Sequence, residues 1–92
     1  MKTEKPLVLI TALKQLLSEN DKTKIGQAYI AVIEEMKSIT FVEGENNHFS
    51  NLVYKHLIQL AIKDFIHAGR SEASATVVND VIDVIAHAEI VR

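Results

Sequence analysis

Residues 72–91, a stretch of twenty near the end of the sequence, carry a wider band of apolar side chains than one packing surface can use. Drawn as a helix at about 100° per residue, the segment is apolar over more than half of its circumference. A surface helix of a monomer needs only one apolar stripe, which faces its core. We therefore expect this segment to pack on two sides, one of them against a second copy of the chain. The residues assigned to this oligomer interface are Val77, Val81, Ile82, Val84 and Ile85.

The composition predicts one aliphatic domain that benefits from assembly. Of the 92 residues 48% are apolar, but there is no Trp, and Phe and Tyr number only three and two. A domain of this size buries only about 60–70% of its extended-chain surface, so a chain this apolar would expose apolar area as a monomer. The absence of Cys excludes a disulfide scaffold, thiolate chemistry and metal sites built on Cys.

The N-terminal segment and the net charge limit the partners. Four consecutive apolar residues, 7–10, precede Thr11. A signal peptide needs about 7–15 such residues and a membrane span about 20, so we expect a cytoplasmic protein with no membrane partner. The net charge of −2 differs from the basic footprint of nucleic-acid binders, and nucleic acid is not an expected partner.

Apolar periodicity and capping residues predict an all-α fold. The expected helices lie near residues 6–18, 22–38, 50–68 and 72–90. Pro6 suits the first position of the first helix, with Thr3 upstream as its cap. Asp21 and Ser71 can cap the second and fourth helices, and Gly69 can end the third. The expected architecture is a small four-helix bundle, a single domain over residues 1–92, that assembles as a two-fold homodimer.

Two segments complicate this picture. Residues 39–42 are β-branched or aromatic and fit an extended segment or a short edge strand, but no partner strand is visible, so a sheet is not expected. Because the connection is long for a helix bundle, where about 2–8 residues are usual, residues 40–47 are expected to be mobile. In the third helix, Val53 and Leu60 form a second apolar patch across from the main face, which includes Leu57.

A polar stripe on the last helix is the best candidate for chemistry. Asp80, Asp83 and His87 follow at i, i+3 and i+7, and carboxylate and imidazole groups one turn apart can bind a divalent metal. The other ligands of such a site cannot be named, and a solvated face with a favourable Asp83–His87 pair accounts for the same residues. The isolated glycines form no phosphate-binding loop. No cofactor, no metal and no enzymatic activity are expected.

The leading hypothesis is a non-enzymatic interaction protein that regulates, inhibits or adapts a larger protein partner. The alternative is a small nucleic-acid-binding regulator whose dimer creates the binding surface, and a metal-dependent enzyme is the least favoured reading. An interface core needs aromatic or large apolar anchors among polar groups, which favours the segment around residues 41–49 over the helical stripe. The residues assigned to partner binding are Phe41, Val42, Glu43, Glu45, Phe49, Asp80, Asp83 and His87.

Overall fold

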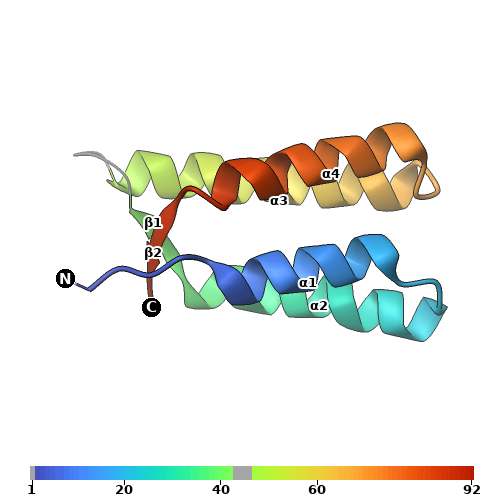
Figure 1. Cartoon of the computed structure of the whole chain (residues 1–92), viewed down its shortest axis with the longest axis horizontal. Helices are drawn as coiled ribbons and strands as arrows, with labels where there is room; N and C mark the ends of the chain where they lie inside the picture. Colours follow the sequence, from blue (N-terminus) through green and yellow to red (C-terminus); the bar gives the residue numbers. More distant parts are fainter. Residues whose placement is uncertain (1, 43–46) are drawn as a thin grey trace.

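The computed structural model describes residues 2–42 and 47–92 and shows two helical hairpins joined by a small sheet (Figure 1). In chain order the elements are α1 (Leu7–Ser18), α2 (Lys22–Ser38), β1 (Thr40–Val42), α3 (Asn47–His67), α4 (Glu72–Ile85) and β2 (Glu89–Val91). Helix α1 packs against α2, α3 packs against α4, and contact between α1 and α4 joins the two hairpins. The protein is therefore mostly helical, with its helices packed in pairs.

The predicted caps of the second and fourth helices are confirmed. Asp21 Oδ1 accepts hydrogen bonds from the backbone N–H groups of Thr23 and Lys24 at 2.9 and 3.2 Å. The Ser71 hydroxyl accepts one from the N–H of Ser74 at 3.3 Å. Both caps satisfy N–H groups that have no partner within the first turn of a helix.

Several predicted helix boundaries differ from the structure. Helix α1 begins after Pro6, and no side chain within residues 2–42 caps it, so the role predicted for Thr3 is wrong. Helix α3 begins at Asn47, earlier than expected, and α4 already ends at Ile85. The last boundary has the largest consequence, because the residues that follow α4 form a strand.

The expectation that no sheet forms is also wrong. Strands β1 and β2 pair antiparallel with Phe41 opposite Ile90. Glu4 extends the pairing, since its N–H and carbonyl exchange hydrogen bonds of 2.9 and 2.8 Å with Ile90. An isolated pair of strands is marginal in water, but here Phe41 and Ile90 are both completely buried. Hydrophobic burial therefore stabilises a sheet that is too small to stand alone.

The core lies between the hairpins and is aliphatic, as the composition predicted, with two Phe rings added. Its largest fully buried side chains are Phe41, Phe65, Leu9, Leu13, Leu16, Ile39, Ile58, Ile62, Ile85, Ile90, Val32 and Val78. They come from all four helices, the sheet and the residue between α2 and β1. Burying one such side chain stabilises the fold by about 1.5–3 kcal/mol relative to its exposure to water.

Gly69 ends α3 as predicted. Its φ is +66°, and the N–H groups of Gly69 and Arg70 donate to the carbonyls of Ile66 and Phe65 at 3.2 and 2.8 Å. These two bonds define a Schellman motif, in which a residue with positive φ closes the helix. Arg70 also has a positive φ, 61°, which is unfavourable for a residue with a side chain.

The side chain of Arg70 joins the second hairpin to the first. Its Nη2 donates to the carbonyls of Leu16 and Leu17 at 3.4 and 3.1 Å, and its guanidinium carbon lies 5.4 Å from the centre of the Phe65 ring. A cation near the last carbonyls of a helix is favourable because those groups lack partners within the helix. This contact lies at the end of the molecule opposite the sheet (Figure 1).

We expect Phe41→Ala to lower the free energy of unfolding by about 3–5 kcal/mol, since it removes a fully buried ring from the core. Phe49→Ala is the matched control, because Phe49 is 62% exposed, and it should change stability by less than about 1 kcal/mol. Urea unfolding followed by circular dichroism measures both. Equal losses for the two variants would contradict the burial of Phe41.

Arg70 can be tested with two replacements. Arg70→Ala loses the bonds to α1 but keeps the unfavourable positive φ, so we expect a loss of about 1–3 kcal/mol in unfolding free energy. Arg70→Gly loses the same bonds and relieves the backbone, so it should be more stable than the Ala variant by up to about 1 kcal/mol. An Ala variant as stable as the unmodified protein would show that the α1 contact contributes nothing.

Candidate interaction surface

Helices α3 and α4 each carry an exposed apolar stripe, and the two stripes lie side by side. On α3, Val53, Leu57 and Leu60 follow at spacings of four and three residues, which places them on one side of a helix. On α4, Val77 and Val84 lie two turns apart. These five side chains are each between 39% and 52% exposed. Together with the half-buried Val81 that lies between the stripes, we call them the α3–α4 face.

The face lies on the outer side of the hairpin. Val78 and Ile82, on the opposite side of α4 from Val84, are buried in the core. In Figure 1 the α1–α2 hairpin lies on one side of the α3–α4 hairpin only. The wide apolar arc predicted from the sequence thus has one side buried within the chain and a second side exposed.

A groove of about 190 Å³ runs along the line where the two stripes meet. The residues that line it are Tyr54, Leu57, Val77, Asp80, Val81, Val84 and Ile85. Sites for small ligands measure about 300–1,000 Å³, so this groove is small for such a molecule. Its dimensions suit side chains that insert from another helix, as ridges pack into grooves between helices.

Charged residues border the face with opposite signs on its two edges. Asp80 lies at the rim of the groove, where helical periodicity places it beyond Val77 and Val84 at the α4 border of the face. Lys63 follows Leu60 by three residues and lies at the α3 border. Both charged side chains are exposed. One edge of the α3–α4 face is therefore acidic and the other basic.

The prediction that Phe41 anchors a partner is wrong. Its ring is fully buried and lies 4.9 Å, centre to centre, from the ring of Tyr54. Its N–H donates to Asn51 Oδ1 at 2.9 Å, so both backbone and side chain belong to the core. The neighbouring Val42 is half-buried in β1. Glu43 and Glu45 lie outside the described residues.

The other residues predicted to bind a partner lie on the surface in two places. Phe49 is exposed at the start of α3, one turn before Val53, and so continues the stripe of that helix. Asp80 and Asp83 are exposed on α4. His87 does not share their helix, because α4 ends before it, and its carbonyl accepts a bond from Lys5 Nζ at 3.4 Å. The structure thus brings Phe49 and Asp80 to the same hairpin surface but separates His87 from it.

The residues predicted for the oligomer interface also divide into two groups. Val77 and Val84 are exposed and Val81 is half-buried, which leaves them accessible to a second copy. Ile82 and Ile85 are only 5% and 1% exposed, so their assignment to a surface between copies is wrong. Helical periodicity shows that α4 has two apolar sides, but it does not show which side faces the core.

The sequence predicts only part of the α3 stripe in this surface. The second apolar patch predicted at Val53 and Leu60 is confirmed, because both side chains are exposed. Leu57, which periodicity places on the core side, belongs to the exposed stripe instead. The signal was the spacing of Val53, Leu57 and Leu60, which a helix that packs on one side only does not require.

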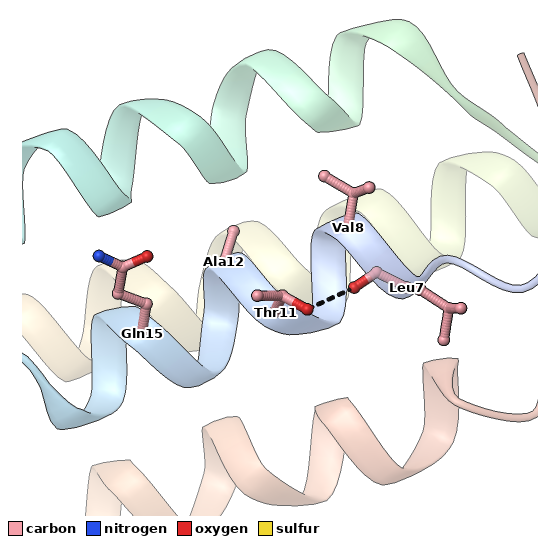
Figure 2. A pocket seen from close by; sticks show the side chains of 5 residues that line it. All are labelled: Leu7, Val8, Thr11, Ala12 and Gln15. Carbon is pink, nitrogen blue, oxygen red and sulfur yellow. Dashed lines mark hydrogen bonds between the residues drawn. The ribbon is translucent and has the colours of Figure 1, made fainter.

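A second apolar patch lies at the start of α1 and is less continuous. Figure 2 shows Leu7 and Val8, both exposed, pointing to different sides of the helix, with Thr11 one turn further along it. The Thr11 hydroxyl donates to the carbonyl of Leu7 at 2.9 Å. This surface therefore lacks the two adjacent stripes that distinguish the α3–α4 face.

Two ionisable groups outside the face have shifted pKa values. Hydrogen bonds from Arg92 to Glu35 and to Glu4 raise the pKa of Arg92 and connect the end of β2 to α2 and to the N-terminal segment. Partial burial lowers the pKa of Lys55, on the opposite side of α3 from the stripe. Within the described ranges, no three His, Asp or Glu side chains gather as metal ligands would.

Comparison with known proteins gives no relative to set beside this surface: no family model, no curated protein and no solved structure matches the chain. Among residues 2–42 and 47–92, none of the helices has the length and apolar character needed to cross a membrane.

The shifted pKa of Lys55 predicts a dependence of stability on pH. Because burial lowers this pKa in the folded state, the charged form destabilises the fold at neutral pH, and this cost disappears as the pH rises toward 10.5, the ordinary value. Lys55→Met should therefore raise the urea midpoint at pH 7. As the pH rises toward 10.5, the urea midpoint of this variant should increase less than that of the unmodified protein. Lys24→Met, at an exposed position of α2, is the control, and an equal rise for both variants would contradict the role of burial.

Proposed function

We propose that this chain is a non-enzymatic interaction protein whose α3–α4 face binds the surface of another protein. The observation that carries the proposal is the face itself, in which five exposed aliphatic side chains lie on two adjacent stripes and three of them, Leu57, Val77 and Val84, line one groove. Single exposed apolar residues are ordinary, whereas a contiguous apolar patch of several hundred Å² marks an interaction site. Burial of such a patch against a partner removes apolar surface from water and so favours binding.

The composition of the patch supports a protein partner. Interfaces between proteins have an apolar centre and a polar rim, and here Leu57 and Val84 lie at the centre while Asp80 and Lys63 lie at the edges. The aromatic side chain of Phe49 extends the centre toward the start of α3. In this role the chain regulates, inhibits or adapts the protein that it contacts.

The polar residues considered for chemistry support the same proposal. General acid–base catalysis and metal binding both need groups that converge in a concave, partly desolvated site. Asp80 and Asp83 are instead exposed on the surface of one helix, and His87 lies beyond its end. As the border of an apolar patch, these carboxylates contribute orientation and specificity to binding.

The test compares two substitutions that are alike except for their position. Leu57→Asp places a charge at the centre of the α3–α4 face, where contact with a partner would bury it without a counter-charge. Ile30→Asp places the same charge on α2, at a side chain of similar exposure, 56% against 42%. We expect Leu57→Asp to remove the protein contacts that the tagged chain makes in its native cells, measured by cross-linking and mass spectrometry, and Ile30→Asp to keep them.

Both substituted positions are exposed, so circular dichroism and urea unfolding should show two folded variants. Identical sets of cross-linked proteins for Leu57→Asp and the unmodified chain would overturn the proposal. A set that disappears on nuclease treatment, or that falls steeply with salt, would favour a nucleic-acid-binding regulator instead.

A further inference from the structure

We propose that the α3–α4 face is covered by a second copy of this chain, related to the first by a two-fold axis that runs parallel to α3 and α4. In this arrangement α3 of each copy lies on α4 of the other. The inference rests on the proposed function and names the partner at the same surface. It is carried by the shape of the face, by its size and by the charges at its two edges.

The shape of the face suits contact with an identical face. The spacings of four and three residues on α3, and the two-turn interval between Val77 and Val84 on α4, resemble the seam positions at which helices of a bundle interlock. Two hairpins docked through these stripes make a second bundle of four helices. Its groove would receive the side chains that project from the partner, such as Leu60 and Val53.

The size of the face also suits a dimer. From Phe49 to Leu60 the apolar α3 stripe runs for about 16 Å at 1.5 Å per residue, and two helices side by side are about 20 Å wide. The resulting apolar footprint of roughly 300 Å² would form the centre of an interface that buries about 800 Å² on each partner once its polar rim is included. Asp64 continues the stripe toward the turn and marks where the apolar centre ends.

Charge decides the direction of the two-fold axis. The charged residue of α4 that borders the face is Asp80, and α4 contains no Lys or Arg, whereas Lys63 lies at the border on α3. An axis perpendicular to the helices would place α4 on its own copy and bring carboxylates together. An axis parallel to the helices instead places the basic edge of each copy over the acidic edge of the other.

The heights of the charged residues along the hairpin agree with the parallel axis. Measured along the helix axes from the α3–α4 turn, the distances to Lys63 and to Asp80 differ by about one helical turn. The two-fold rotation preserves height and exchanges the edges, so Lys63 of each copy comes to lie near Asp80 of the other. A helix of another protein would have to supply this basic edge, whereas a second copy already carries it.

The test exchanges the charges and then mixes the variants. Lys63→Glu alone sets a new carboxylate against Asp80, and Asp80→Lys alone sets a new ammonium group against Lys63. Each variant should therefore dimerise at least about tenfold more weakly than the unmodified chain. An equimolar mixture of the two variants places opposite charges at both edges and should restore the dimer. Light scattering and sedimentation of the full chain at tens of micromolar measure the masses.

Cysteine cross-linking gives a second measurement that does not depend on affinity alone. The chain has no Cys, so Lys63→Cys and Asp80→Cys each introduce a single reactive thiol. A short bis-maleimide should link a Lys63→Cys chain to an Asp80→Cys chain in a mixture, and should link neither variant to itself. Self-linking of Asp80→Cys would show that α4 packs on α4 and would overturn the parallel axis.

The outcomes separate this inference from the proposed function. A monomeric unmodified chain whose cross-links to another protein still depend on Leu57 would overturn the dimer and leave the interaction proposal standing. A dimer that survives Leu57→Asp would place self-association elsewhere and overturn the inference. Loss of the dimer in Leu57→Asp, its retention in Ile30→Asp and its return in the charge-exchanged mixture would together support it.

Discussion

The pairing of Phe41 with Ile90 determines how the two hairpins meet and therefore which surface stays exposed. It draws the end of α2, the start of α3 and the end of α4 together at one end of the molecule. Arg70 joins the hairpins at the other end through the last carbonyls of α1. Because these two contacts fix both ends of the hairpins, α4 lies against α1, and Val78 and Ile82 are buried in the core. The opposite side of the hairpin is left to form the α3–α4 face.

Local signals in the sequence predict the helices well. They do not predict the pairing of strands that lie far apart in the sequence. Asp21, Ser71 and Gly69 act within a few residues of their own positions, and each works as its residue type predicts. The sheet joins residues that are about fifty positions apart. Glu89–Val91 follows an amphipathic helix without a break in apolar character, so periodicity extends that helix to the end. The fully buried contact of Ile90 with Phe41 explains why the chain leaves the helix after Ile85.

The same limit explains the outcome for the candidate site. The width of the apolar arc on α4 shows that the helix has two packing sides, and Val77 and Val84 on one of them are indeed exposed. Periodicity cannot rank the two sides, so it places Ile82 and Ile85 on the surface although they fill the core. Phe41 is predicted on the surface because the strand that covers it is not visible in the sequence. Each error comes from a contact with a distant part of the chain.

The residue types on the α3–α4 face are difficult to explain by folding alone. Val has a lower helix propensity than Ala, Lys or Glu because its branched side chain loses freedom in a helix. At an exposed helical position it also keeps apolar surface in water. Val53, Val77 and Val84 carry both costs, and each is at least 39% exposed, so burial in the core returns little of that free energy. Contact with another protein surface would return it, because a β-branched side chain has little rotational freedom left to lose on binding. The residues that lower the stability of the single chain are therefore the same residues whose burial would stabilise an assembly, which supports a role for the α3–α4 face in binding.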